Sequence, residues 1–379
     1  MRDRPFWLGK LSDAWRERSV VWLMGVRRAG KTVLAQSVSN SEYLDCELPS
    51  VRRQLTDPES FLKERRGTTV VLDEIHRLPD AAELLKVAAD HFKTTRVLAT
   101  GSSTLGASAR FRDTLAGRKR EVWLTPMTQA DLGAFDRNDL GRRLLRGGLP
   151  PFFLADSLPE RDFEEWTEAY WAKDVLELFR LERRHAFQRL LELLMAQSGG
   201  IFEATPLAHA CGVSRPTIAA YLAVLEATFV MHVVRPYAES GAAEIIAAPR
   251  VYGFDTGFVC HHRGWHTLRR DDHGPLWEHF VLNELHAHYG RAPIRYWRTK
   301  HGNEVDFVLT RRGRSPVAIE CKWSADSFEA TSLRAFRNRY PAGNNFVIAQ
   351  DVSRPYTKRF GALAVRFVGI DHVGGLDEA

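Results

Sequence analysis

Residues 25–32 read Gly-Val-Arg-Arg-Ala-Gly-Lys-Thr and form a complete GxxxxGK[ST] phosphate-binding loop. The loop follows the apolar run 20–24 and precedes a helical pattern at 31–39, so strand, loop and helix come in the order that such a loop needs. Glycines let backbone N–H groups curl around phosphate oxygens, and the start of a helix favours an anion. The sequence therefore predicts a nucleotide site built by Gly25, Arg28, Ala29, Gly30, Lys31, Thr32 and Val33.

The residue types of this loop fit ATP with Mg²⁺. Lys31 would neutralise the β- and γ-phosphate charge, and the Thr32 hydroxyl would ligate Mg²⁺. A second stretch, 69–74, is an apolar strand that ends in two carboxylates, as a Walker B segment does. Asp73 would hold the Mg²⁺ shell and Glu74 would polarise the attacking water. Acidic residues at a strand end are usually just solvated, but a full phosphate loop upstream favours the functional interpretation.

Two further positions are candidates for sensing or stabilising the γ-phosphate. The apolar strand 96–100 closes on Thr100, Ser102 and Ser103, which would suit a polar sensor, although a simple strand-to-loop turn explains them equally well. Arg118 follows Leu-Ala-Gly and would stabilise transition-state charge, either in its own chain or in a neighbouring subunit. The alternative for Arg118 is an ordinary surface charge.

Composition limits the protein classes to consider. The chain has 379 residues, 44% of them hydrophobic and 26% charged, which is typical of a soluble protein with two or three domains. We find no apolar run long enough to span a bilayer and no signal-peptide core at the start, so we expect a cytoplasmic location and no membrane partner. The four cysteines are scattered and the histidines lack metal-ligand spacing, which indicates neither a zinc site nor a disulfide framework. A net charge of +6 suits a polyanion such as nucleic acid, unless it reflects only a bias toward arginine codons.

The pattern along the chain predicts three domains. Apolar strands at 20–24, 42–45, 69–73, 96–100 and 121–124 alternate with helical stretches, which implies helices packed on a largely parallel sheet in a domain 1–149. Gly-Gly-Leu-Pro-Pro at 147–151 breaks this pattern. A helical block at 162–198 and the segment after it form a predicted middle domain, 150–249, and residues 250–379 form the last.

The segment 205–228 has the outline of a helix-turn-helix. A short helix, a turn at Gly212, and a second helix capped by Ser214 with Pro216 in its first turn support this prediction. Arg215, Thr217 and Tyr221 would lie on the exposed leading face of the second helix, where contacts to DNA are made. The extended segments 229–236 and 245–252 would form a wing. The alternative is that the module serves as a lid or as a protein-docking surface.

A second group of charged residues lies in the last third of the chain. On the predicted strand 304–309, a period of two places Glu304, Asp306 and Val308 on one face. On the predicted strand 317–323, the same period places Glu320 and Lys322 together. Upstream, Glu278 shares the apolar stripe of an amphipathic helix, 276–289, where a carboxylate is costly without a partner.

This set matches a metal-dependent phosphodiesterase. Asp306 and Glu320 would be the main Mg²⁺ ligands, Glu278 a further ligand or an orienting base, and Lys322 the ammonium that orients or deprotonates the attacking water. The alternative is a salt bridge on a strand face, between Lys322 and Asp306 or Glu320. We interpret Glu304 and Glu284 as solvated.

With both sets of motifs in hand, the chain resembles a prokaryotic family of AAA-type P-loop ATPases that carry a C-terminal domain related to the PD-(D/E)xK nucleases. Residues 25–32, 72–75, 100–103 and 116–118 look like the ATPase motifs, and residues 252–257, 277–281, 304–307 and 319–322 look like the C-terminal ones. One departure is that Val305 stands where the nuclease motif has proline. The resemblance implies an α/β fold class: a P-loop NTPase domain with a parallel sheet, a helical and winged-helix middle, and a restriction-endonuclease-like end.

The leading hypothesis is an Mg²⁺-dependent ATPase that couples its nucleotide state to DNA binding and to phosphodiester cleavage by the C-terminal domain, with a homo-oligomer as the candidate assembly. One alternative is a nucleotide-gated DNA-binding switch whose nuclease-like domain is inactive. Another makes the helix-turn-helix and the last domain protein-docking surfaces of a regulatory oligomer. Only the last of these predicts no salt-dependent affinity for DNA.

Overall fold

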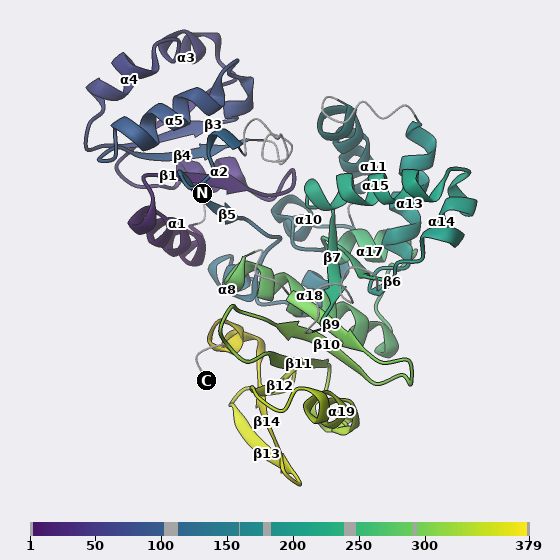
Figure 1. Ribbon diagram of the computed structural model, residues 1–379. Coiled ribbons are helices and arrows are strands. Elements are labelled where there is room, and N and C mark those ends of the chain that lie inside the picture. Colours follow the sequence, from purple (N-terminus) through teal and green to yellow (C-terminus); the bar gives the residue numbers. More distant parts are fainter. Residues whose placement is uncertain are drawn as a thin grey trace.

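The computed structural model describes residues 3–101, 113–158, 160–176, 183–238, 248–290 and 294–376. Three regions are distinct in space: an N-terminal α/β region, a helical middle, and a C-terminal region built on a second sheet (Figure 1). Within the described ranges, we find no helix that combines the length and the apolar character needed to cross a membrane.

The N-terminal region is built on five parallel strands in the order β2-β3-β4-β1-β5. The strands are β1 (Val20–Met24), β2 (Ser41–Asp45), β3 (Thr69–Asp73), β4 (Arg96–Thr100) and β5 (Lys119–Trp123). The helices are α1 (Pro5–Glu17), α2 (Lys31–Gln36), α3 (Pro49–Gln54), α4 (Pro58–Glu64), η1 (Ile75–Arg77) and α5 (Ala81–His91). Figure 1 shows α5 and α1 on opposite faces of the sheet, which explains why β1 is buried along its whole length. The predicted parallel sheet is confirmed.

The strand order determines which loops meet. Strand β4 lies between β1 and β3, and the carboxyl ends of parallel strands share one edge of a sheet. The phosphate loop after β1, Thr100 at the end of β4 and Asp73 at the end of β3 therefore share that edge. Arg118 comes just before β5 and lies at the opposite edge.

Among the described residues, the second sheet has nine strands in the order β13-β14-β12-β11-β10-β9-β7-β8-β6. They are β6 (Gly200–Ile201), β7 (Met231–Pro236), β8 (Arg250–Gly253), β9 (Ile294–Arg298), β10 (Glu304–Leu309), β11 (Val317–Lys322), β12 (Asn345–Ala349), β13 (Tyr356–Phe360) and β14 (Leu363–Val368). Strands β7 and β8, which come from the segments predicted to form a wing, pair as an antiparallel hairpin, but β7 also pairs in parallel with β9. The hairpin is thus part of the C-terminal sheet rather than a free wing, and the sheet runs through the boundary predicted at 249.

The middle of the chain is helical. Its elements are α8 (Gln129–Ala134), α9 (Leu140–Arg146), α10 (Pro150–Leu154), α11 (Glu160–Ala169), the π-helix η2 (Tyr170–Val175), α13 (Arg184–Ala196), α14 (Ala204–Cys211), α15 (Arg215–Ala227) and α17 (Thr256–His262). Helices α14 and α15 flank a turn at Gly212, which has φ +63°, and the Ser214 hydroxyl caps α15 by accepting from the Thr217 N–H. The predicted exposure of Tyr221 is wrong, because its side chain is 4% exposed and packs edge-on against Phe187 at 5.3 Å.

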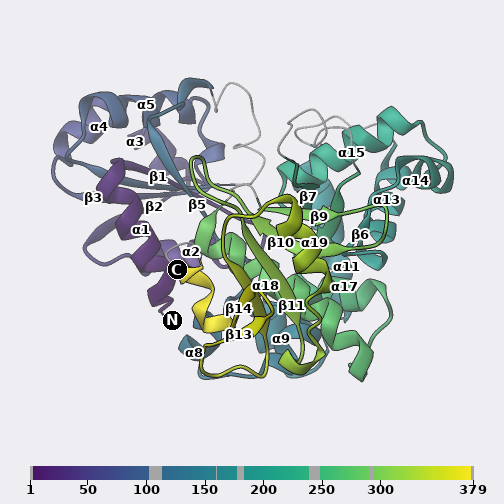
Figure 2. The ribbon, with the colours of Figure 1, turned by 60° about the horizontal axis from the view of Figure 1, so that its bottom comes forward.

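Helix α18 (His273–Tyr289) lies at the junction of the three regions, as the views in Figures 1 and 2 agree. The remaining elements, η3 (Arg270–Asp272), η4 (Ala325–Ser327), α19 (Thr331–Arg339) and η5 (Ile370–Gly375), surround the second sheet. The sequence predicted one apolar stripe on α18, but the helix is buried on most of its circumference, including at Asn283 and Glu284. Such a helix is in contact with structure on several sides rather than on one.

Candidate active sites

The phosphate loop has the backbone that its glycines permit. Gly25 has φ +153°, and a Cβ there would lie 2.5 Å from the Leu124 carbonyl oxygen. Gly30 is left-handed, with φ +97°, and caps α2. Lys31 Nζ donates to the carbonyl oxygens of Gly25 at 2.9 Å and Val26 at 3.1 Å, so the ammonium lies inside the curl of the loop. The local geometry is that of a phosphate cradle at a helix N-terminus, with Thr32 in its first turn.

Two elements outside the loop hold its backbone in place. Arg4 donates to the Ala29 carbonyl oxygen at 3.0 Å and forms a buried ion pair with Asp131 at 2.6 Å. On the other side, the Trp166 indole N–H donates to the Arg27 carbonyl oxygen at 2.9 Å. Sequence reasoning missed Arg4, Asp131 and Trp166, because single residues far apart in the chain carry no local signal. The nearest available signal is the pair Thr128 and Asp131, which forms a capping box on α8.

Asp73 and Thr100 form the polar end of the central strands. The Asp73 side chain is 2% exposed and accepts hydrogen bonds from the Thr100 hydroxyl and, at 2.7 Å, from the Tyr43 hydroxyl. The Thr100 hydroxyl also accepts from the Glu74 N–H at 3.2 Å. Thr100 is thus coupled to both carboxylate residues, as expected of a polar sensor. Ser102 and Ser103, the other sensor candidates, lie outside the described residues.

Glu74 has a different environment from its neighbour. Its backbone is left-handed, with φ +52°, which directs it away from the line of β3. Its carboxylate lies 3.1 Å from His76 Nδ1. Burial opposes ionisation of Glu74, but His76, Lys31 and Arg27 outweigh burial and lower the pKa of this carboxyl. Glu74 is therefore ionised at neutral pH and lies in the field of the Lys31 ammonium.

Of the other predicted members of this site, Val33 and Arg28 lie in or next to the phosphate loop, whereas Arg118 lies far from it. Val33, on the surface of α2, is 45% exposed, and Arg28 is paired with Asp162 of α11 at 3.3 Å. Arg118 pairs with Asp90 at 2.8 Å, at the start of β5. Because β5 runs parallel to β1, Arg118 is level with Ser19, six residues before the start of the loop, and lies about 20 Å along the sheet from it, at about 3.3 Å per residue. A role for Arg118 in the nucleotide site of its own chain is therefore wrong, and a role in a neighbouring subunit stays a prediction.

The C-terminal sheet brings the second predicted set together. Lys322 Nζ lies 2.8 Å from Glu320 Oε2 and 3.9 Å from Asp306 Oδ2, and Asp306 also accepts from the Cys321 N–H at 2.8 Å. The predicted shared face of Asp306 and Val308 is wrong. The pairing of β10 with β9 shifts register between Val305 and Val308, and both valines pack in the same core cluster. A β-bulge of this kind redirects side chains that a period of two would place elsewhere.

Glu278 joins this set from α18. Its carboxylate accepts from the Tyr252 hydroxyl at 2.5 Å and lies 3.0 Å from the Arg250 guanidinium. Arg250 also pairs with Glu304 at 2.6 Å, so the prediction that Glu304 is merely solvated is wrong. Sequence reasoning missed Arg250 and Tyr252, although the costly carboxylate on a buried helix indicated that some partner had to exist.

The charges in this cluster perturb one another. Burial, and then repulsion from Asp306, raise the pKa of Glu278 to about 7 and that of Glu320 to about 8. Burial opposes the charge of Lys322, but Asp306 and Glu320 outweigh it and raise its pKa, so Lys322 is an ammonium at neutral pH. Such a group orients water rather than deprotonating it. In the part of the chain that the structure describes, no three His, Cys, Asp or Glu side chains are grouped to hold a metal ion.

The other end of α18 contacts α1 of the N-terminal region and the segment around the start of α8. The predicted solvated position of Glu284 is wrong, since the residue is 2% exposed and its carboxyl accepts from the Gln129 N–H of α8 at 2.6 Å. Asn283 donates to the Pro126 carbonyl oxygen at 3.0 Å, and Lys10 of α1 donates to the His288 carbonyl oxygen at 2.8 Å. Helix α18 thus carries Glu278 of the C-terminal cluster near its start and contacts α1 and α8 near its end.

Comparisons with known proteins agree with the first site. Residues 17–132 match an AAA domain, residues 137–269 a domain of unknown function (DUF8612), and residues 273–365 another (DUF4143). The uncharacterized proteins Rv2008c of Mycobacterium tuberculosis and Mb2031c of Mycobacterium bovis are each 30% identical over 343 residues, which cover 86% of this chain and 75% of the relative. Among solved structures, the Walker-type ATPase PABY2304 of Pyrococcus abyssi matches 69% of this chain and 96% of its own, at 16% identity and a TM-score of 0.43. The chain therefore belongs to the same family as these two mycobacterial proteins, and its N-terminal region is an AAA-type P-loop ATPase domain.

Proposed function

We propose that this protein binds and hydrolyses ATP with Mg²⁺ and uses its nucleotide state to control the C-terminal region. The observation that carries the proposal is the hydrogen-bonded set Asp73, Thr100 and Glu74 at the sheet edge that also bears the phosphate loop. A buried carboxylate, a polar sensor and an ionised glutamate beside a phosphate cradle are the parts that P-loop ATPases use.

Each residue would have a distinct role. Lys31 and the loop N–H groups would bind the β- and γ-phosphates, and the oxygens of Thr32 and Asp73 suit Mg²⁺, which would neutralise the phosphate charge. Glu74 would accept a hydrogen bond from the attacking water and orient it toward phosphorus. Thr100 would hold both acidic residues in register. Arg118 would act on the nucleotide of a neighbouring subunit, in which case the active form is a homo-oligomer.

Substitution of Glu74 tests this assignment. Glu74→Gln keeps the size of the side chain and removes its charge, so we expect ATP turnover to fall about 100-fold or more while ATP binding is retained. Lys31→Ala should abolish binding, and Glu59→Gln, an exposed position on α4, is the matched control. Unchanged turnover in Glu74→Gln would show that another group orients the water.

The path from the nucleotide to the C-terminal region would run through α18. The Ala29 carbonyl accepts from Arg4, Arg4 pairs with Asp131 of α8, and the Gln129 N–H of the same helix donates to Glu284 of α18. The same helix carries Glu278 nearly two turns earlier, beside Arg250. Because packed elements move as units, a shift of the phosphate loop would move Glu278 relative to the second sheet.

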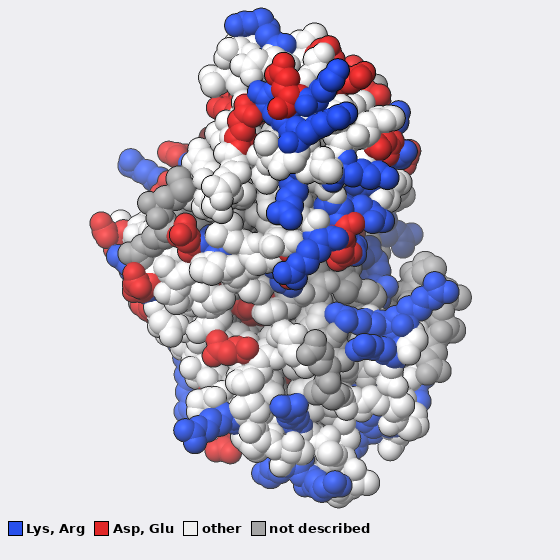
Figure 3. All heavy atoms as spheres, turned by 90° about the vertical axis from the view of Figure 1, so that its left-hand side faces the viewer, with Lys and Arg blue, Asp and Glu red and all other residues white. Residues whose placement is uncertain are grey.

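A second candidate function, cleavage of phosphodiester bonds in DNA, is favoured by the Asp306, Glu320 and Lys322 cluster. Asp306 and Glu320 would bind Mg²⁺ as a pair and Glu278 would be the orienting base, although each carboxylate already has a protein donor or cation beside it. Lys322 would orient the attacking water as an ammonium. Binding would use Arg215 and Thr217 at the start of α15. The net charge of +6 supports a polyanionic partner, as does the face in Figure 3, where Lys and Arg gather toward the right-hand half.

A cleavage assay separates this candidate from its alternatives. Single-stranded, duplex and branched DNA would be incubated with Mg²⁺, with and without ATP, using wild type, Lys322→Ala, Lys31→Ala and the remote surface control Lys63→Ala. Cleavage lost only in Lys322→Ala and altered in Lys31→Ala supports an ATP-controlled nuclease. Salt-dependent DNA binding without cleavage favours a nucleotide-gated switch, and no DNA affinity favours a protein-docking role.

A further inference from the structure

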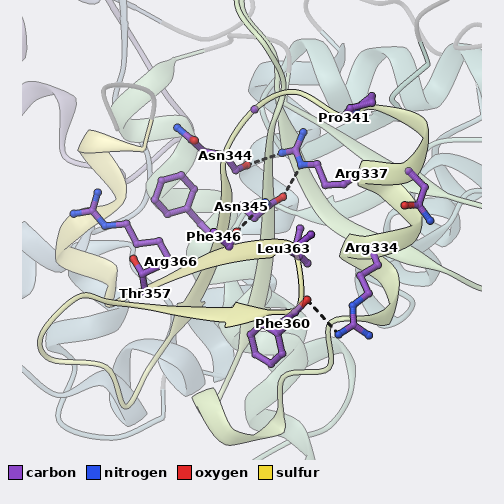
Figure 4. Close-up of a pocket in the computed structure, with 14 residues that line it drawn as sticks. Arg334, Arg337, Pro341, Asn344, Asn345, Phe346, Thr357, Phe360, Leu363 and Arg366 are labelled. Carbon is purple, nitrogen blue, oxygen red and sulfur yellow. Dashed lines mark hydrogen bonds between the residues drawn. The ribbon is translucent and has the colours of Figure 1, made fainter.

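The C-terminal region has a hollow that neither candidate site uses. It lies between α19, the start of β12 and the β13-β14 hairpin, and has a volume of 660 Å³ (Figure 4). This volume is in the range of small-molecule sites, roughly 300–1,000 Å³. Ala318 and Asn345 begin the parallel pairing of β11 with β12, and Lys322 and Ala349 end it. The hollow, at the Asn345 end, is therefore separate from the Glu320 and Lys322 cluster.

Buried hydrogen bonds fix the walls of the hollow. Arg337 is 8% exposed as a residue, and its guanidinium donates to the carbonyl oxygens of Pro316 at 3.0 Å and Asn344 at 2.6 Å, and to Asn345 Oδ1 at 2.6 Å. Asn345 in turn donates to the Ala364 carbonyl oxygen of β14 at 3.0 Å. Burial lowers the pKa of Arg337 to about 10, which leaves it cationic at neutral pH. The loop before β12 and the edge of β14 are thus held in a fixed geometry around a buried positive charge.

The lining combines cations, neutral polar groups and apolar surface. Arg334 and Arg366 lie on opposite sides of the hollow, and Arg334 is tied to the Phe360 carbonyl oxygen at 3.4 Å (Figure 4). Asn338 and Thr357 add polar groups, whereas Phe346, Phe360 and Leu363 supply apolar surface. Among the described lining residues, none is acidic. Such a lining suits an anion that also has an apolar part.

We propose that this hollow binds a nucleotide unit, with phosphate on its arginines and the base against Phe360. Guanidinium groups match the geometry of phosphate oxygens, and amide and hydroxyl groups commonly contact phosphate and sugar. Arg334 and Arg366 lie on different sides of the hollow (Figure 4), so each would meet a different part of the ligand. The half-buried Phe360 ring already contacts Phe328 and Lys358, and its remaining exposed part would supply a stacking surface for a base. The unit comes either from a nucleic-acid strand or from a free nucleotide, and in the first case the inference rests on the proposed DNA function.

Binding measurements in a Lys31→Ala background test the site, because that substitution removes the phosphate loop as a competing nucleotide site. The probes are a fluorescent single-stranded oligodeoxynucleotide, followed by anisotropy, and thymidine 5′-monophosphate, followed by calorimetry. The test variants are Arg334→Ala and Arg366→Ala. The matched controls are Arg339→Ala on the same helix and Arg359→Ala on the same hairpin, both exposed and outside the lining. All four should keep the melting temperature of the background.

We expect each test variant to weaken binding about tenfold and each control less than twofold. If the test variants weaken binding of the oligonucleotide, the site binds a nucleic-acid strand. If they weaken binding of the mononucleotide, the site binds a free nucleotide. If the test and control variants weaken binding equally, the inference is overturned, because the probes then respond to the overall positive charge of the surface and not to this hollow. Competition by poly-glutamate as strong as by oligonucleotide would also overturn it. If the protein does not cleave DNA but only the two test variants lose nucleotide binding, this site is supported and the nuclease proposal is wrong.

Discussion

Glu284 has an environment unlike that of an ordinary exposed glutamate. Its carboxyl is held in the contact between α18 and α8, and burial raises its pKa from 4.5 to about 8. Between these two pH values the folded chain keeps a proton that the unfolded chain has released. The free energy of unfolding therefore falls as pH rises from 4.5 to 8, by about 1.4 kcal/mol for each unit of pKa difference that is realised.

Glu284→Gln should remove this fall in unfolding free energy with pH. The amide oxygen still accepts from the Gln129 N–H, and the amide carries no charge at any pH. We expect the variant to match wild type near pH 4.5 and to be more stable by a few kcal/mol, in order of magnitude, near pH 8. Chemical denaturation at a series of pH values measures the difference, with the exposed Glu329→Gln as control. Parallel pH curves for Glu284→Gln and wild type would contradict the raised pKa.

At the scale of elements, α15 has one exposed and one buried face, and the sequence did not predict that Tyr221 lies on the buried one. Tyr221 packs against Phe187, so Tyr221→Ala should cost about 3 kcal/mol of unfolding free energy, and Tyr221→Phe should cost little. Arg215→Ala, at the exposed start of the helix, should leave stability unchanged and weaken any DNA binding. Thermal and chemical denaturation compare the three. Wild-type stability in Tyr221→Ala would show that the tyrosine contributes no packing.

The elements that were predictable are those fixed by local patterns. The phosphate loop, the five parallel strands and the turn at Gly212 follow from glycine positions and from hydrophobic periodicity. The bulge in β10 was not predictable, because it depends on the register with β9. The environments of Glu284, Arg250 and Tyr221 depend on which elements pack together, and one sequence carries no record of those contacts.

In the candidate sites, too, residues placed by local patterns were predictable, and residues placed by packing between elements were not. Asp73 and Thr100 were predictable because parallel strands bring their ends together once the strand order is assumed. The cluster of Asp306, Glu320 and Lys322 followed from element order, but the pairing of Arg250 with Glu278 did not, since Arg250 comes from a strand expected in a separate wing.

On the scale of the whole molecule, α18 connects the ATPase domain to the second sheet. Its last turns are held by α1 and α8, and its first turns carry Glu278 and bury Trp277, whose indole N–H donates to the Ile348 carbonyl oxygen at 3.0 Å. A helix fixed at both ends transmits a displacement along its axis better than a loop does. The two sites are therefore expected to respond to each other, with nucleotide binding altering the exposure of α18.

Hydrogen–deuterium exchange of the α18 backbone, with and without ATP and Mg²⁺, tests this coupling most directly. Glu74→Gln would hold the protein in the ATP-bound state, and Lys31→Ala would serve as the variant that does not bind ATP. We predict that ATP changes exchange in residues 273–289 as well as in the phosphate loop, and that Lys31→Ala abolishes both changes. Protection confined to the phosphate loop and α2, with α18 unaffected by ATP, would contradict the account.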